Sequence, residues 1–382
     1  MVPNNLAKNF LSNRPLIGGL LLLLLSPLVS AERQVHHNGF LTAAFSQTDS
    51  ATSYSGIADD INFSEMSVIG IQTKFQPSAA QMHFTIQLLA RGSRGWDVDA
   101  EWAYVGFKLA DAYEFQIGKI RAPMFLVSET LDVGITYPWI RPPVELYGFA
   151  NIPFTTVNGM KAKRRFHWMD LDLQLLAYVG ENPSQASSLN AFEFNLTDLI
   201  IGGVELLILN DKWKIRASYH DAPELSYDAT DSIAADPNVG AIFSALAPSG
   251  ILSFDASFAT FGGQYDSEHW LLMGEVGQRK VSASGGSKNT NYFITIGRKL
   301  ESLLLHVTYS EFDTDSTTIV QNQSTTTIGI KKGLNPTTSI KAELSQVNLQ
   351  GTGSIGLYDI LPGNAVDKDP AHILGIALNM VF

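Results

Sequence analysis

Charged residues of opposite sign occur in neighbouring parts of the sequence, and together they could bind or sort ions and polar solutes. One group lies within 122–153 and is acidic with one exception: Glu129, Asp132, Glu145 and the basic Arg141. A basic group lies on either side of it: Lys119, Arg121, Lys161, Lys163, Lys214 and Arg216. Opposed charges across a narrow passage of low dielectric constant create a transverse field that acts on the charge and dipole of a solute. The alternative for each side chain is a solvated charge with no selective role.

Residues suited to catalysis or metal binding are scattered along the chain. His83, His306 and His372 lie in predicted strands, and none has a neighbouring serine and acid arranged for nucleophilic catalysis. Four aspartates fall in predicted connections: Asp313, Asp315, Asp367 and Asp369. They could bind calcium, although solvated loop acids explain them better. The chain has no cysteine, which excludes a thiol nucleophile and a thiolate metal site, so we expect no enzyme, no cofactor and no metal site.

The segments that would position these residues show a hydrophobic period of two. In 212–221, Trp213 and Ile215 alternate with basic residues such as Lys214. Successive side chains of a β-strand point to opposite faces, so such a strand has one apolar and one polar face. We count sixteen segments of this kind, each near the length that a tilted strand needs to cross a bilayer. They are 35–46, 66–77, 81–91, 98–109, 112–121, 154–166, 169–180, 197–209, 212–221, 253–264, 268–282, 288–298, 302–312, 323–334, 337–349 and 371–382.

The connections between these segments alternate between short and long. The long ones are 47–65, 122–153, 181–196, 222–252 and 350–370. Short turns on one side of a membrane and long loops on the other are typical of transmembrane barrels. The sequence therefore predicts an all-β fold, a 16-stranded antiparallel transmembrane β-barrel. Side chains fill the interior of an eight-stranded barrel, whereas sixteen strands leave a water-filled channel.

The segment 371–382 shows the alternation most clearly. Its even positions, from Leu374 to Phe382, are large and apolar, while its odd positions are mostly small or polar. We expect the even positions to face lipid. We also expect the strand to pair with 35–46, because this pairing would close the barrel and remove its exposed sheet edges. Phe382 is then an assembly residue and not a pore residue.

The first 31 residues have the composition of an export signal peptide. Lys8 and Arg14 precede an apolar stretch, 16–29, and small residues follow it at a cleavage position. We therefore divide the chain into a signal peptide, 1–31, and a barrel domain, 32–382. The formal net charge of −11 argues against a nucleic-acid partner.

The segment 122–153 is a long connection whose five prolines keep it out of a sheet. Within it the chain reads SETLDVG at 128–134 and YPWIRPPVELY at 137–147. With the final strand, these motifs resemble the general porin superfamily of Gram-negative bacteria, in particular porins of gammaproteobacteria. The resemblance implies a long third loop folded into the lumen, where its acidic residues face basic residues of the wall. It also implies a homotrimer in the outer membrane, made by the barrel-assembly machinery and in contact with lipid and lipopolysaccharide.

The function predicted on this basis is an outer-membrane porin through which small hydrophilic solutes diffuse passively. One alternative is a channel selective for an anion, a sugar or an oligosaccharide. Five loop aromatics could form an apolar track for a sugar: Phe125, Tyr137, Trp139, Tyr147 and Phe149. A second alternative is a non-conducting barrel, such as a hydrophobic-substrate transporter, a lipase or an adhesin. The hydrophobic-substrate transporter would carry a longer plugging segment before its first strand.

Two of the basic residues have no definite face at this stage. The apolar residues Phe115 and Ile117 are expected to face lipid. Strict alternation would send Lys119 and Arg121 to the same side, where a charge costs about 2–4 kcal/mol at the bilayer midplane. A bulge, or a strand that ends before Lys119, would bring both side chains inside.

Overall fold

The computed structural model describes residues 34–77, 81–110, 112–148, 154–181, 185–189, 192–230, 233, 249–282, 286–315, 320–360 and 364–382. The predicted signal peptide lies outside this part of the chain. Among the described residues, no helix is long and apolar enough to span a membrane. Most of the regular structure is β-strand.

The strands form a single antiparallel sheet. Within the described residues they are β1 (Gln34–Thr48), β2 (Val68–Gln76), β3 (Met82–Arg91), β4 (Val98–Leu109), β5 (Tyr113–Arg121), β6 (Thr156–Trp168), β7 (Leu171–Glu181), β8 (Gln185–Leu189), β9 (Phe192–Leu209), β10 (Trp213–Asp228), β11 (Ile251–Asp266), β12 (Trp270–Val281), β13 (Ser287–Leu300), β14 (Leu303–Thr314), β15 (Gln323–Asn335), β16 (Thr338–Leu349) and β17 (Ala371–Val381). The short helices described between them are η2 (Gly92–Arg94), η3 (Ser128–Thr130), η4 (Gly134–Thr136) and α2 (Val144–Tyr147).

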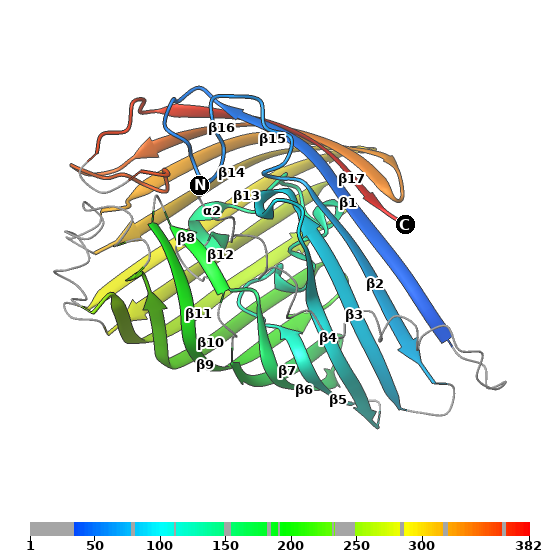
Figure 1. The fold of residues 1–382 in the computed structure, drawn as a ribbon. Helices are drawn as coiled ribbons and strands as arrows, with labels where there is room; N and C mark the ends of the chain where they lie inside the picture. Colours follow the sequence, from blue (N-terminus) through cyan, green and yellow to red (C-terminus); the bar gives the residue numbers. More distant parts are fainter. Residues whose placement is uncertain are drawn as a thin grey trace, which may run out of the picture.

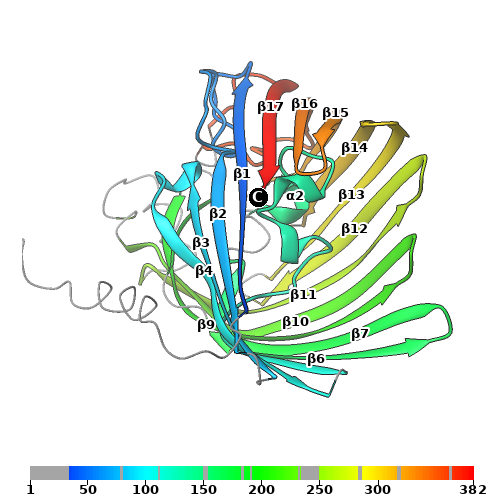
Figure 2. The ribbon, with the colours of Figure 1, turned by 90° about the vertical axis from the view of Figure 1, so that its right-hand side faces the viewer.

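The sheet closes into a barrel because β1 pairs with both β2 and β17 (Figures 1 and 2). Phe40 lies opposite Val381, and Thr48 lies opposite Ile373. The short strand β8 pairs with the start of β9, whereas the rest of β9 pairs with β7. Sixteen of the described strands therefore form the wall, and the predicted 16-stranded antiparallel barrel is confirmed.

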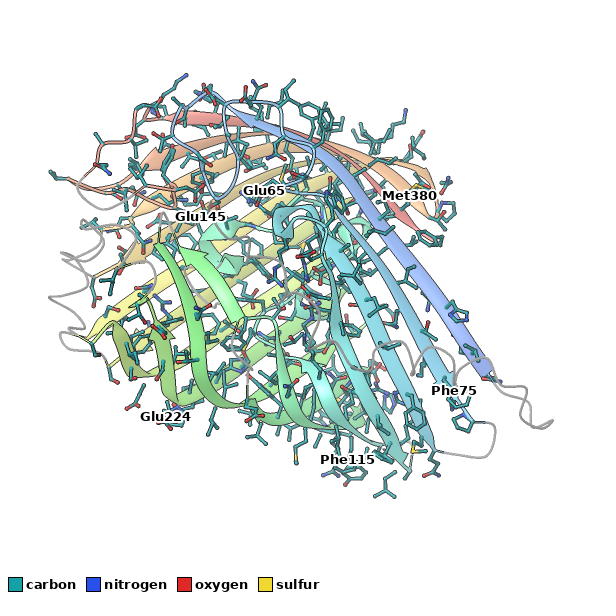
Figure 3. All side chains as sticks on the ribbon, in the orientation of Figure 1. Glu65, Phe75, Phe115, Glu145, Glu224 and Met380 are labelled. Atoms are coloured by element: carbon teal, nitrogen blue, oxygen red, sulfur yellow. The ribbon has the colours of Figure 1, made fainter. Side chains whose placement is uncertain are left out.

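The outer face of the wall is apolar. In β17 the side chains of Leu374 and Ile376 are exposed, while the alternate Ile373 and Ala377 are buried. Figure 3 shows that Phe115 likewise projects away from the wall. A closed wall with such an exterior is suited to lipid, so the barrel is of the transmembrane type. The predicted outward orientation of the even positions in the last strand is confirmed.

Residues near Phe382 close one end of the seam between β1 and β17. Phe382 and Gly39 exchange two backbone hydrogen bonds, of 2.7 and 2.9 Å. A Cβ atom at Gly39 would lie 2.2 Å from the Phe382 ring, so glycine lets the ring lie directly against β1. These contacts are compatible with the predicted assembly role of Phe382, which stays a prediction.

Two aspartates join the connections that follow the other end of the seam. The Asp367 carboxylate accepts a hydrogen bond from the Ala51 amide at 2.8 Å. The Asp49 carboxylate accepts one from the His372 amide at 2.7 Å. We call these two contacts the loop latch, because they tie the connection after β1 to the residues around the start of β17.

The strands β9, β10 and β11 are longer than the sequence predicts. β10 continues to Asp228 and β11 begins at Ile251, both inside the predicted connection 222–252. β8 and the start of β9 lie in the predicted connection 181–196. The register of β10 shifts around Pro223. Because proline has no N–H to donate to a ladder, it interrupts the alternation that would mark a continuing strand.

Candidate functional site

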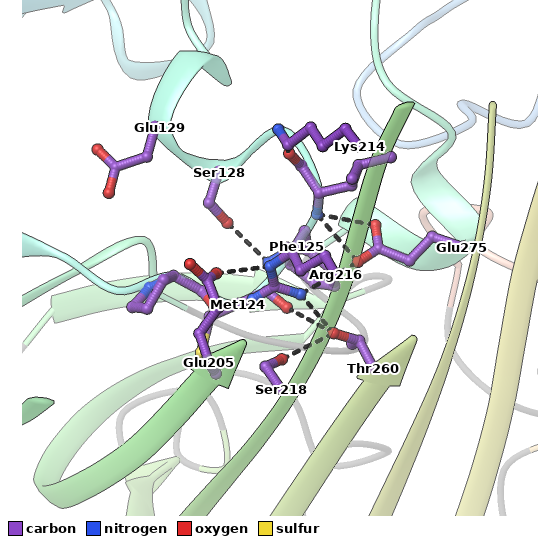
Figure 4. Close-up of polar contacts among 12 residues, drawn as sticks. Met124, Phe125, Ser128, Glu129, Glu205, Lys214, Arg216, Ser218, Thr260 and Glu275 are labelled. Carbon is purple, nitrogen blue, oxygen red and sulfur yellow. Dashed lines mark hydrogen bonds and ion pairs between the residues drawn. The ribbon is translucent and has the colours of Figure 1, made fainter. Parts of the chain in front are cut away.

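Buried charges hold the start of the segment 122–148 against the polar face of the wall, opposite the exposed apolar face. Arg216 of β10 is buried, and its Nε donates to Glu205 of β9 at 2.6 Å. The same guanidinium lies 3.3 Å from Glu275 of β12 and donates to the carbonyl oxygen of Pro123. Glu275 also accepts a hydrogen bond from the Leu126 amide at 2.9 Å (Figure 4). The side chains of the wall thus bind backbone groups of the segment.

Aromatic side chains of the segment pack against the same face. Trp139 is buried, and its Nε1 donates to Thr308 at 2.9 Å and to Thr295 at 3.1 Å. Its ring meets Phe293 edge-on, with centroids 5.1 Å apart. Phe125 is buried as well. Complete burial of a side chain such as Phe125 contributes about 1.5–3 kcal/mol, so packing adds to the polar contacts that fix the segment.

Residues of β16 bind the middle of the segment. Lys341 is buried and donates to the carbonyl oxygen of Gly134 at 2.6 Å and to that of Trp139. Two residues along the same strand, Glu343 accepts a hydrogen bond from the Ile140 amide at 2.9 Å. A buried charge requires partners that replace its lost hydration, and here backbone groups of the segment supply them.

Glu145 in α2 has partners different from the basic wall residues that the sequence predicts for it. It is buried and accepts hydrogen bonds from Ser310 at 2.8 Å, Gln323 at 2.7 Å and Tyr54 at 3.3 Å. The hydroxyl of Thr325 donates to the same carboxylate. The last helix of the segment is therefore fixed by neutral hydrogen-bond donors of β14, β15 and the connection after β1.

Asp132 joins two arginines of the wall. Its carboxylate lies 2.7 Å from Arg91 and 2.5 Å from Arg121, and Glu101 pairs with the same arginines at 3.0 and 3.1 Å. Burial alone would raise the pKa of Asp132, but the charges of Arg121 and Arg91 hold that pKa below its usual range. The cluster places a carboxylate of the segment against two arginines of the wall, while its role in a pore constriction stays a prediction.

The end of β5 resolves the uncertain orientation of Arg121. Phe115 and Ile117 are exposed on the outer face, whereas Arg121 is buried beside Asp132. The alternation holds as far as Ile120, which is buried, and β5 keeps its register with β4 and β6 throughout. It breaks between Ile120 and Arg121, where the strand ends. Lys119 is partly buried, and within the described part of the chain it forms no ion pair.

The other predicted site residues fall into two kinds. Lys161 of β6 is buried and pairs with Glu129 of the segment at 3.1 Å, while the Glu129 side chain remains 55% exposed. Lys163 pairs at 3.7 Å with Glu114 of β5. The remaining two bind backbone carbonyl oxygens: Lys214 binds Leu126 at 2.7 Å, and Arg141 binds Ser55 at 3.0 Å. Their effect on selectivity stays a prediction.

Comparison with known proteins shows which structures this chain is similar to. Neither a protein-family model nor a curated protein matches the sequence. OmpT of Vibrio cholerae, in its trimer form, is 12% identical, with a TM-score of 0.59 over 92% of this chain and 99% of that one. The anion-selective porin from Comamonas acidovorans is also 12% identical, with a TM-score of 0.59 over 92% and 100%. The outer membrane channel DcaP of Acinetobacter baumannii is 9% identical, with a TM-score of 0.56 over 92% and 97%.

This chain has the fold of the outer-membrane porins. At these identities the likeness establishes the fold and not a particular porin family.

Several charged residues of this porin-like wall are absent from the predicted site. They are Arg91, Glu101, Glu205, Glu275, Lys331, Lys341 and Glu343. Lys341 and Glu343, for example, alternate with the exposed apolar residues Ile340 and Leu344. Their face can be read from that alternation, whereas their partners in the segment 122–148 cannot, because the contacts join residues far apart in the chain.

The described aromatic residues among those considered for a sugar track do not form one. Phe125, Tyr137 and Trp139 are buried, and Tyr147 packs against the same apolar cluster. Phe149 lies outside the described residues. Because the wall covers the buried rings, they offer no continuous apolar surface to a passing solute.

Proposed function

We propose that this protein is a porin of the outer membrane, through which small hydrophilic solutes diffuse passively. The proposal rests chiefly on the contacts of the segment 122–148 with the polar face of opposite parts of the wall, from Arg91 on β3 to Lys341 on β16. In this proposal the segment folds into the lumen and narrows it. A barrel of sixteen strands is wide enough to retain a water-filled channel beside such a segment.

We further propose that the two opposed pairs, Asp132 with Arg121 and Glu129 with Lys161, set the electric field of the narrowed passage. Their separations of 2.5 and 3.1 Å support this role. Since the Glu129 side chain is half exposed, its charge acts on a solute directly, while Asp132 acts from a buried position.

The finer proposals concern the family and the assembly. We propose a general porin of the gammaproteobacterial type, without enzymatic activity, that assembles as a homotrimer through the barrel-assembly machinery and contacts lipopolysaccharide. The motifs at 128–134 and 137–147 support the family, and the trimer form of OmpT from Vibrio cholerae supports the trimer.

Recordings from planar lipid bilayers test the channel. Added folded protein should raise the current in discrete, roughly ohmic steps, whereas a sample unfolded before addition should not. Circular dichroism confirms the fold of each sample. Folded protein that produces no steps would contradict the channel and favour a non-conducting barrel, such as a hydrophobic-substrate transporter, a lipase or an adhesin.

A further inference from the structure

Two arginines lie on the apolar outer face of the barrel, close to one of its rims. Arg164 is on β6 and Arg298 is on β13, and each lies within four residues of the end of its strand. At this end short connections join β6 to β7 and β13 to β14, so we call it the turn rim and the opposite end the loop rim. The outward-facing neighbours of the two arginines include the exposed side chains of Phe166 and Ile296.

Aromatic rings support both guanidinium groups. Arg164 lies over the ring of Tyr113 at 5.4 Å and over that of Phe166 at 5.8 Å. Arg298 lies over the ring of Trp270 at 4.8 Å. Tyr113 and Trp270 are directly opposite these arginines on the neighbouring strands, so the register of the sheet sets the contacts. A ring covers one face of the guanidinium plane and leaves the N–H groups at its edge available.

These N–H groups have no partner in the part of the chain that the structure describes, where neither arginine forms a hydrogen bond or an ion pair. A charge on the lipid-facing surface is tolerated near the interface, where polar groups can reach it. A free hydrated anion would have to remain among exposed apolar side chains. A phospholipid instead has its phosphate at the interface and its acyl chains along the apolar wall.

Aromatic residues at the loop rim have partners of the opposite charge. The hydroxyl groups of Tyr292 and Tyr309 donate to the Glu311 carboxylate at 2.8 and 2.7 Å. The Tyr219 hydroxyl donates to Asp221 at 3.4 Å. Outward-facing aromatic residues thus contact cations at the turn rim and carboxylates at the loop rim. A phosphate group is attracted to the first arrangement and repelled by the second.

We propose that Arg164 and Arg298 each bind the phosphate group of a phospholipid in the leaflet at the turn rim. The edge of each guanidinium donates two N–H groups to phosphate oxygens, because its planar fork matches their geometry. The supporting rings hold the guanidinium in place and pack against the apolar part of the same lipid. The inference goes beyond the proposed channel function, since it requires only that the barrel lies in a membrane.

The test titrates the full-length folded protein in detergent with phosphatidylglycerol and counts the retained lipids by native mass spectrometry. Diacylglycerol with the same acyl chains is the control lipid, because it lacks the phosphate. The unchanged protein should bind phosphatidylglycerol more tightly than diacylglycerol. Arg164→Gln and Arg298→Gln should each weaken the binding of phosphatidylglycerol by about 5-fold, as expected for one basic residue at a membrane surface. Neither change should alter the binding of diacylglycerol.

Arg94→Gln is the matched control variant. Arg94 is an exposed arginine of η2, at the loop rim, where it pairs with Asp99 at 3.5 Å. This variant should bind phosphatidylglycerol as the unchanged protein does, and circular dichroism confirms the fold of all variants. Arg164→Lys, which keeps the charge and loses the planar fork, should bind more weakly than the unchanged protein and more tightly than Arg164→Gln.

Three results would overturn the proposal. They are equal binding of the two lipids by the unchanged protein, equal binding of phosphatidylglycerol by the glutamine variants at 164 and 298 and the unchanged protein, and release of the lipid by an equimolar amount of inorganic phosphate. The last result would assign the arginines to a free anion. Lipid retention does not require conduction, so a protein that gives no current steps can still pass this test, and a conducting protein can still fail it.

Discussion

Two parts of the barrel wall hold the segment 122–148 in different ways. On the side of β10 to β16, buried charges such as Arg216 and Lys341 bind carbonyl oxygens of the segment. On the side of β3 to β6, Arg121 and Lys161 bind the side chains of Asp132 and Glu129. Aromatic packing covers much of the first side.

We infer that the contacts with carbonyl oxygens fix the position of the segment, whereas the contacts between side chains act through their charges. A carbonyl oxygen is present at every position of the chain, so contacts with it place the segment whatever its side chains are. A contact between two side chains depends on both residues and places two opposite charges side by side. We therefore expect substitutions on the first side to alter stability and substitutions on the second side to alter ion selectivity.

The largest effect is expected from Arg216→Met. The change leaves Glu205 and Glu275 buried without their shared cation, and loss of one partner of a buried ion pair costs about 3–5 kcal/mol. Denaturant unfolding in detergent measures the loss, and current noise should increase as the segment loosens. Arg164→Met on the exposed side of β6 is the control and should change stability little. Equal stability of both variants would remove the fixing role.

Asp132→Asn should change selectivity more than stability when compared with Arg216→Met. The variant loses charge-assisted hydrogen bonds with Arg91 and Arg121, and this loss costs about 1.5–3 kcal/mol of stability. The two arginines keep their contacts with Glu101. The cluster gains one positive charge, so the reversal potential in a salt gradient should shift toward anion selectivity. An unchanged reversal potential would show that this cluster lies away from the ion path.

A smaller shift in the same direction is expected for Glu129→Gln. The side chain is half exposed and its pair with Lys161 is open to water, so dissolved ions screen its field. The shift of the reversal potential should therefore shrink between low and high salt, with little change in the unfolding midpoint. A shift that is independent of salt would place Glu129 in a buried passage instead.

The loop latch lies outside both groups of contacts with the segment, and a change in it is expected to have the smallest effect. Partial burial tends to raise the pKa of Asp49, but hydrogen bonds from His372 and Lys368 lower that pKa to about 2. Hydrogen bonds, chiefly from Ser50, also hold the pKa of Asp367 below its usual range. A carboxyl group with a lowered pKa stabilises the fold above its unfolded value of about 3.9 and loses this effect as the pH falls through the folded value.

We therefore expect the latch to be intact at neutral pH and to weaken as the pH falls from about 4 toward 2. Hydrogen exchange at the Ala51 and His372 amides, corrected for the intrinsic rate at each pH, measures this weakening. Asp49→Asn should reproduce the loss at the His372 amide at neutral pH without altering ion selectivity. Protection that stays constant down to pH 2 would exclude the carboxylates as its source.

The alternation of side chains made the barrel wall predictable. A strand fixes the face of each residue locally, so 212–221 revealed both a strand and the inward orientation of Lys214 and Arg216. The rule failed at Arg121, where β5 ends, and Pro223 concealed the continuation of β10. These two exceptions arise from backbone conformations that the period of two does not report.

The partners of the site residues were less predictable than their faces. Glu145 is an acidic residue in the predicted place, but neutral donors such as Ser310 and Gln323 surround it. The pairing of Asp132 with Arg121 agrees with the predicted opposition, yet Arg91 was missed. Such contacts depend on the path of the whole segment 122–148, which four prolines and several short helices determine together.

The seam between β1 and β17 also bears on the order of folding. Its two strands are separated by nearly the whole barrel domain, so their ladder has the highest sequence separation in the molecule. Loop-closure entropy makes such contacts slow to form. Until they form, the sheet has two unpaired edges that can bind other chains. The fold therefore requires that nascent chains be kept apart until the first and last strands have met.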